Sequence, residues 1–292
     1  MFRSPALVGA GLVATLIGGF AIGKAAPGEV PASVSSPNPT VVPPHSHGGG
    51  AGTGGAGTDV AGSTLSAAGL TLQPQSMTFQ AGVTQPFTFR IIGADGKPVT
   101  TFLAAHDKLL HLIVVGRDLS GYQHLHPSMA VDGTWSVPLT LPGAGVWRAY
   151  ADFVAVGTTG QQVAVTLGVD VTVPGEYLPA ALPPAAREGS DGALTVRYEG
   201  TPQAGAAQPI TMRVSSAGTP VTNLQRYLGA YGHLVVVREG DLAYLHVHAD
   251  DQLTNGGVRF WLTAPSQGRY RAFFEFQIAD TVHTAEFTVQ VG

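Results

Sequence analysis

The sequence His111-Leu-Ile-Val-Val-Gly-Arg-Asp118 recurs 122 positions later as His233-Leu-Val-Val-Val-Arg-Glu-Gly240. Each copy is a short β-branched run that leads into a polar, glycine-containing turn, which is typical of a strand. A His-x-His element follows each copy, as His124-Leu-His126 and His246-Val-His248. The chain is therefore predicted to contain two equivalent domains, each built around the same strand and the same three histidines.

The duplication extends through the other strand-like runs. Gln85-Pro-Phe-Thr-Phe-Arg-Ile91 matches Gln208-Pro-Ile-Thr-Met-Arg-Val214, and Gly145-Val-Trp-Arg-Ala-Tyr-Ala-Asp-Phe153 matches Gly268-Arg-Tyr-Arg-Ala-Phe-Phe-Glu-Phe276. About seven short strands in about 100 residues, separated by Gly, Pro, Asn or Asp turns, predict an all-β chain of two tandem immunoglobulin-like β-sandwich domains. The expected strands are residues 87–92, 109–115, 146–154 and 163–173 in the first repeat and 210–214, 234–237, 258–262, 269–278 and 284–291 in the second.

The 292 residues divide into an N-terminal part and the two repeats. Residues 1–24 are predicted to be a signal peptide or a signal-anchor hydrophobic helix, because no charge interrupts the chain from Pro5 to Gly23. Residues 25–68 are expected to be a disordered Gly/Ala/Pro-rich tether. Residues 69–174 form the first repeat, residues 175–190 a linker and residues 191–292 the second repeat. We therefore expect an extracytoplasmic protein of the cell envelope, either secreted or held at the membrane by its N-terminal segment.

Composition excludes several classes of function. Only 12% of the residues are charged and the net charge is -4, so the chain lacks the basic surface that binding to nucleic acid requires. Cysteine is absent, which excludes disulfides, thiol redox chemistry and cysteine-ligated zinc sites. A bound metal ion must therefore be held by histidine, carboxylate, methionine or backbone ligands.

Six of the ten histidines occupy duplicated positions, and each trio is predicted to form one metal site. Side chains at i and i+2 of a strand share a face about 6.6 Å apart, so a His-x-His element offers two imidazoles together. A hairpin with Glu239-Gly240 at its turn pairs His233 with His246, and the same register pairs His111 with His124. Three imidazoles on one face suit Zn(II) or Cu(II) with an open coordination position. The alternative is that these histidines are structural and hydrogen-bond to the backbone.

Two duplicated carboxylates are candidates for orienting the imidazoles. Asp152 and Glu275 occupy matching positions on a predicted strand and could accept an imidazole N–H. Arg148 and Arg271 lie on the same face of that strand, and ion pairs with these arginines are the simpler expectation.

Three further residues are expected to lie outside the predicted metal sites. Met129 follows His126 closely and could offer a thioether to Cu(I), but the second repeat has no methionine at this point, so a packing role is expected. His106 and His283 lack duplicated counterparts and are expected at the surface.

The first repeat resembles exported bacterial β-sandwich proteins of the YtkA-like and FixH-like type. The resemblance lies in the segment from Leu112 to Pro127, in Gly133-Thr-Trp135 and in Gly145–Phe153. These proteins are associated with copper handling or oxidase assembly. The resemblance implies copper rather than zinc as the bound metal, and a membrane metal transporter or an oxidase assembly factor as the partner. It covers the first repeat well and the second in weaker form, because the second copy lacks the proline after its His-x-His element.

The leading hypothesis is an exported or membrane-anchored metal-binding protein, a carrier or delivery module with a three-histidine site in each repeat, and not an enzyme. Binding is then expected to weaken as the pH falls through the imidazole range near 6.5. One alternative is a tandem immunoglobulin-like interaction module with structural histidines. Another is a cupin-like metalloenzyme, because Gly240 and His246-x-His248 match the opening of a cupin motif, although no glutamate follows at the required spacing.

Overall fold

The computed structural model describes residues 61–247 and 249–292. The predicted export segment and nearly all of the predicted tether lie outside the described residues, as do His248 and the side chain of His246. Both β-domains belong to one compact unit of the chain. Within the two described ranges, no helix combines the length and the apolar character needed to cross a membrane.

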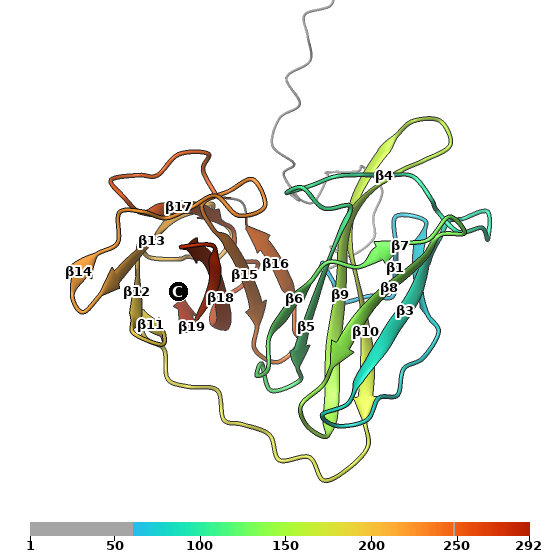
Figure 1. The fold of residues 1–292 in the computed structure, drawn as a ribbon, viewed down its shortest axis with the longest axis horizontal. Coiled ribbons are helices and arrows are strands. Elements are labelled where there is room, and N and C mark those ends of the chain that lie inside the picture. Colours follow the sequence, from blue (N-terminus) through green and yellow to red (C-terminus); the bar gives the residue numbers. More distant parts are fainter. Residues whose placement is uncertain (1–60, 248) are drawn as a thin grey trace, which may run out of the picture. The chain divides into compact units, whose positions relative to one another are not determined.

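The N-terminal β-domain, called here the first sandwich, is built from ten strands among the described residues. They are β1 (Ser66–Ala67), β2 (Leu70–Pro74), β3 (Thr84–Ile92), β4 (Phe102–Leu103), β5 (Leu110–Gly116), β6 (Gln123–Leu125), β7 (Ser128–Met129), β8 (Thr134–Thr140), β9 (Gly145–Val156) and β10 (Gln162–Val173). One sheet has the order β1-β2-β3-β8-β7, and the other has the order β10-β9-β5-β6 with β4 paired to β9 (Figure 1).

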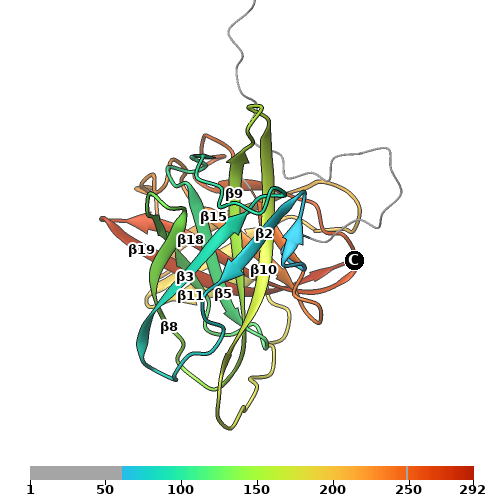
Figure 2. The same ribbon diagram turned by 90° about the vertical axis from the view of Figure 1, so that its right-hand side faces the viewer.

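Alternating side chains explain how the first sandwich closes. Phe87, Phe89 and Ile91 of β3 point to the interior while the residues between them are only partly buried, so this sheet has one core face and one open face. The long strands β9 and β10 pair along their whole length (Figure 2). Strand β5, by contrast, is buried at every position. Both faces of the sheet that contains β5 must therefore be covered.

The C-terminal β-domain, called here the second sandwich, repeats this plan. Its strands among the described residues are β11 (Glu188–Asp191), β12 (Leu194–Glu199), β13 (Gln208–Ser216), β14 (Thr219–Pro220), β15 (His233–Arg238), β16 (Tyr244–Val247), β17 (Val258–Leu262), β18 (Gly268–Ile278) and β19 (Thr281–Val291). One sheet has the order β11-β12-β13-β14 with β17 paired to β13, and the other has the order β16-β15-β18-β19. Strand β15 corresponds to β5, and β18 corresponds to β9.

The prediction of an all-β chain with two tandem immunoglobulin-like sandwiches is confirmed. Each expected strand overlaps an observed one, and residues 258–262 are reproduced without change as β17. The first sandwich starts at Ser66 and the second at Glu188, a few residues before the expected starts, because a short strand pairs with the next one in each case.

The second face of the β5 sheet is covered by the second sandwich. Ile113 and Tyr150 of the first sandwich share one buried apolar cluster with Val235 and Phe273 of the second. The ring of Tyr122 stacks on that of Phe273 with centroids 4.1 Å apart. The hydroxyl of Tyr150 donates a hydrogen bond of 2.7 Å to the carbonyl of Leu242. The two histidine-bearing sheets therefore face each other.

Candidate metal centre

His111, His124 and His126 form a histidine cluster at one end of the β5 sheet. Each offers one ring nitrogen, and these three nitrogens lie within 4.8 Å of one another. The ring centroids are 5.1 Å apart for His111 and His124, 5.1 Å for His111 and His126, and 4.7 Å for His124 and His126. The structure thus brings together the first predicted trio.

The predicted register of the hairpins is wrong by two residues. His124 pairs with Ile113 rather than with His111, and His246 pairs with Val235 rather than with His233. The reason is a wider turn: the N–H of Arg238 donates to the carbonyl of Ala243, so the hairpin loop holds four residues and not two. A shift of two preserves strand parity, which is why the three histidines of the first trio still share a face.

A tight turn fixes the tautomer of His111. Ala105 and Lys108 exchange backbone hydrogen bonds around His106 and Asp107, whose φ angles are 50° and 61°, as in a type I′ turn. The Nε2 atom of His111 lies 2.9 Å from the carbonyl of Ala105. Because a carbonyl can only accept, Nε2 carries the hydrogen, and the neutral ring directs the lone pair of Nδ1 into the cluster.

The second sandwich contains an equivalent turn, which also binds the first histidine of its trio. Tyr227 and Ala230 exchange backbone hydrogen bonds around Leu228 and Gly229, which also have positive φ angles. His233 Nε2 donates to the carbonyl of Tyr227 over 2.8 Å. Both sandwiches therefore set the same tautomer on the first histidine of the trio. Sequence reasoning missed these turns because only one of the four central residues is a glycine.

The carboxylate that orients His124 comes from the other sandwich. Glu275 of β18 accepts a hydrogen bond of 2.5 Å from His124 Nδ1, and the two side chains are only 8% and 4% exposed. On the opposite side of the ring, Nε2 lies 2.9 Å from His111 Nδ1. The Nε2 atom of His124 is thus directed at the cluster.

The expected ion pairs between the duplicated carboxylates and arginines are wrong. Arg148 instead binds Asp170, its cross-strand neighbour on β10. Arg271 binds Glu286 of β19. Asp152 accepts a hydrogen bond of 2.9 Å from the hydroxyl of Thr166. The arginines reach across to the adjacent strand because a carboxylate there lies nearer than one further along their own strand.

His126 is the member of the cluster with unused bonding capacity. Its Nε2 atom is buried and has no hydrogen-bond partner among the described residues. Burial, together with the neighbouring charges of His124 and Lys108, lowers the pKa of His126 to about 4. The ring is therefore neutral at physiological pH, which is the state in which imidazole binds a metal.

The free energy of unfolding of the metal-free protein is expected to decrease as the pH falls from about 6.5 to about 4. The unfolded chain protonates His126 near the ordinary pKa of 6.5, whereas the folded protein protonates it only at about 4. Between these values the unfolded state binds more protons, so acid favours it. Urea unfolding across this range, on the wild type and on His126→Gln, measures the effect. Equal pH dependence in the two proteins would contradict the prediction.

The second trio is described only in part. His233 is 5% exposed, and its ring centroid lies 6.3 Å from that of His124 in the first sandwich. The His246 side chain and His248 lie outside the described residues. The expectation that His106 is a surface residue is wrong: it is half-buried, and its ring lies 6.1 Å from that of His111 and 5.0 Å from that of His233. The histidines of the two repeats therefore approach each other.

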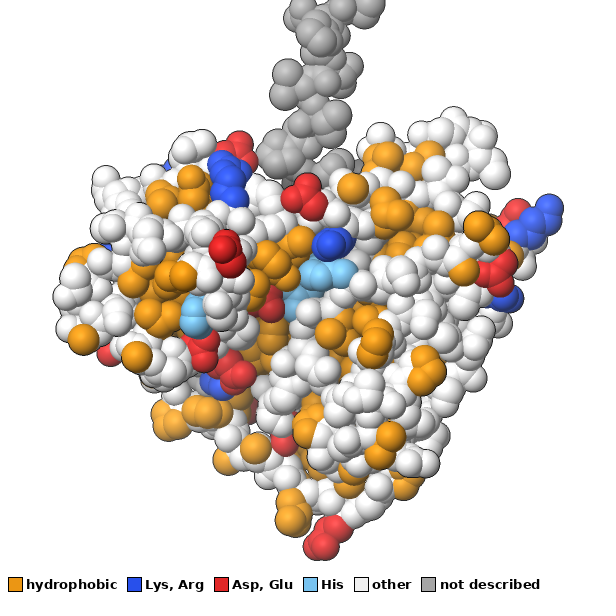
Figure 3. All heavy atoms as spheres, viewed as in Figure 1, with side chains coloured by type: hydrophobic (Ala, Val, Ile, Leu, Met, Phe, Trp, Pro, Cys, Tyr) orange, Lys and Arg blue, Asp and Glu red, His pale blue; other side chains and the backbone are white. Residues whose placement is uncertain are grey.

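The remaining candidates have structural roles. Met129 packs against the core of the first sandwich, as expected. His283 is half-buried rather than exposed, binds Asp191 over 2.8 Å and stacks on Phe276. In Figure 3 histidine atoms are visible at two places on this face, and those near its centre lie beside a basic side chain, so solvent reaches them.

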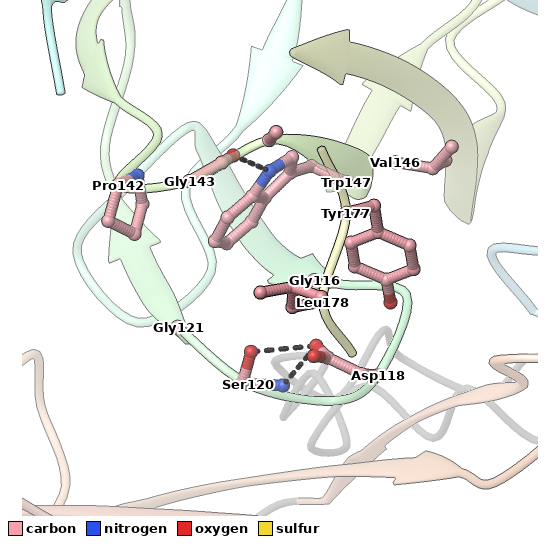
Figure 4. A pocket seen from close by; sticks show the side chains of 11 residues that line it. Gly116, Asp118, Ser120, Gly121, Pro142, Gly143, Val146, Trp147, Tyr177 and Leu178 are labelled. Atoms are coloured by element: carbon pink, nitrogen blue, oxygen red, sulfur yellow. Dashed lines mark hydrogen bonds between the residues drawn. The ribbon is translucent and has the colours of Figure 1, made fainter. Parts of the chain in front are cut away.

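A separate pocket of about 290 Å³ lies at the other end of β5 (Figure 4). Trp147 and Tyr177 line it, and the Trp147 indole N–H donates to the carbonyl of Gly143 over 3.1 Å. Burial tends to raise the pKa of Asp118, but hydrogen bonds from Ser120 and Ala180 outweigh this and lower it. Asp118 thereby ties the linker between the sandwiches to the β5–β6 turn.

Comparisons with known proteins show a family. The family described as "Domain of unknown function (DUF8832)" matches residues 65–172 and 188–292. Among curated proteins, none matches this sequence. Similar solved structures include the adhesin FdeC of Escherichia coli, with 19% identity, a TM-score of 0.26 and coverage of 80% of this chain and 66% of that one. The Ig1-2 module of the Drosophila receptor protein tyrosine phosphatase DLAR has 10% identity, a TM-score of 0.20 and coverage of 76% and 98%. These likenesses concern the fold alone.

Proposed function

Because the chain belongs to the DUF8832 family, which matches it in two parts and whose description assigns no activity, we propose a function from the site itself. The protein is an extracytoplasmic metal-binding protein that carries or delivers its ion and does not catalyse a reaction. The observation that supports this most directly is the histidine cluster, in which three ring nitrogens lie within 4.8 Å of one another.

The donor set suits a transition metal. His111 has its tautomer set by Ala105, His124 is oriented by Glu275, and His126 has a buried nitrogen with no partner among the described residues. Ligands around a tetrahedral ion with bonds of about 2.0–2.1 Å stand about 3.3 Å apart, so the three nitrogens, which lie within 4.8 Å of one another, must draw together by up to about 1.5 Å to hold one. Buried polar atoms are otherwise hydrogen-bonded, and a bound ion supplies the partner that His126 lacks.

Copper is the proposed metal, and zinc is the competing choice. Imidazole binds both ions, and Cu(II) is preferred over Zn(II) by a given nitrogen site. The resemblance to YtkA-like and FixH-like proteins favours copper as well, and it suggests a membrane metal transporter or an oxidase assembly factor as the recipient. Three protein ligands leave an open position through which a recipient can take over the ion.

The competing function is an interaction module in which the histidines only join the two sandwiches. The contact between His124 and Glu275 favours it, because this buried pair bridges the two domains by direct side-chain contact. The two functions differ in what the removal of a histidine does. A structural histidine contributes stability, whereas a ligand contributes metal affinity.

Calorimetric titration of the full chain with Cu(II) and with Zn(II) tests the proposal. The wild type is compared with His124→Ala/His126→Ala, with His246→Ala/His248→Ala and with the combination of the four substitutions. We expect each double variant to lose one bound ion and the combined variant to lose both. His283→Ala is the matched control, since this histidine has a carboxylate partner outside the cluster. Unchanged binding in all variants would leave the histidines as structural residues.

A further inference from the structure

We propose that the second sandwich completes the metal site of the first through Glu275, so that metal binding and the docking of the two sandwiches stabilise each other. This inference rests on the proposed function. It adds a positioning residue that lies 151 residues away from the ligand it orients.

The histidine cluster and the contact between the sandwiches occupy one continuous face. His111 alternates with Ile113 along β5, and His124 follows Tyr122 by two residues, so ligands and contact residues point the same way. On the second sandwich, Phe273 and Glu275 are likewise two residues apart on β18. Tyr122 stacks on Phe273, and His124 binds Glu275. The contact between His124 and Glu275 therefore lies next to the apolar contact between the sandwiches and extends it with a polar pair.

Glu275 acts on the ligand through the far side of its ring. By accepting the Nδ1 hydrogen of His124, the carboxylate leaves Nε2 as the ligand atom and increases its basicity, as carboxylates do for metal-bound histidines elsewhere. Asp152, the counterpart in the first sandwich, sits opposite His111 in the sheet but accepts a hydrogen bond from Thr166. The carboxylate that binds His124 is therefore supplied by the second sandwich.

Thermodynamic linkage makes this dependence reciprocal. If docking of the second sandwich increases the metal affinity of the first by some factor, then metal binding increases docking by the same factor. Loss of a carboxylate that orients a metal-bound histidine typically weakens affinity 10–100-fold. A coupling of that size would add to the apolar contact and favour the docked arrangement about 10–100-fold more when the ion is bound.

The test uses the full chain carrying His246→Ala/His248→Ala, so that the cluster of the first sandwich is titrated alone, with Zn(II) and Cu(II) as the probes. Glu275→Gln is expected to raise the Kd 10–100-fold. Glu275→Asp keeps the charge and is expected to recover part of the affinity. Glu286→Gln is the matched control, because it removes a carboxylate that binds Arg271 in the same sheet and, among the described residues, is not a hydrogen-bond partner of a histidine. The Kd of this variant should stay within about twofold of that of the parent.

Hydrogen exchange provides a second measurement, which would not respond to Zn(II) through Glu275 if this residue had only a structural role. Zn(II) is expected to slow amide hydrogen exchange in β18 of the parent, by a factor no larger than the change in Kd that Glu275→Gln causes. This slowing should vanish in Glu275→Gln but persist in Glu286→Gln. Equal affinity in Glu275→Gln, or no slowing in the parent despite tight binding, overturns the inference and leaves the metal function intact. A parent that binds neither ion overturns both.

Discussion

Replacement of His126 by alanine is expected to weaken metal binding at the first sandwich about 100-fold or more while leaving the metal-free protein as stable as the wild type. The loss of a direct ligand should exceed the 10–100-fold effect of losing a group that only orients one. Stability should not suffer, because the substitution removes a buried nitrogen that has no hydrogen-bond partner among the described residues and a ring that is only partly buried. A residue that provides affinity without contributing stability is typical of a functional site.

The measurement pairs calorimetric titration of Cu(II) and Zn(II) with urea unfolding of the metal-free protein. It is made in the His246→Ala/His248→Ala background, with His283→Ala as the control for the loss of an imidazole elsewhere. Unfolding that becomes easier by more than about 2 kcal/mol, together with unchanged affinity, would identify His126 as a structural residue and favour the interaction module.

Replacement of Phe273 by alanine is expected to lower the free energy of unfolding by about 3–5 kcal/mol, the usual cost of deleting a buried phenylalanine ring. Phe273 is fully buried, stacks on Tyr122 and belongs to the apolar cluster shared by the two sandwiches. The substitution should therefore weaken the contact between the two sandwiches, and the two sandwiches should unfold in separate steps.

Phe276→Ala is the matched control, since this residue lies on the same strand but packs inside the second sandwich. It should destabilise the second sandwich by a similar amount without separating the domains. Urea unfolding followed by circular dichroism and tryptophan fluorescence distinguishes the cases, because Trp135 and Trp147 lie in the first sandwich and Trp261 in the second. A loss of less than about 1 kcal/mol in Phe273→Ala would show that the sandwiches are not joined by a packed core.

The sequence by itself determined the strands, the two sandwiches and the composition of the first trio. These features are local: β-branched runs between turn residues set the strands, and the period of two puts His124 and His126 on one face. Even the incorrect hairpin register left this conclusion intact, because an error of two residues does not change the face.

Only the tertiary structure decided what surrounds the histidines. The register depended on a four-residue loop in which Glu239-Gly240 does not form the two-residue turn that it suggests, and the tautomer of His111 depended on the carbonyl of Ala105. The pairing of Glu275 with His124 depended on which sheet faces meet when two sandwiches dock. No pattern within either repeat encodes that choice, because both repeats carry a carboxylate at the same position and long-range packing alone selects which imidazole it contacts.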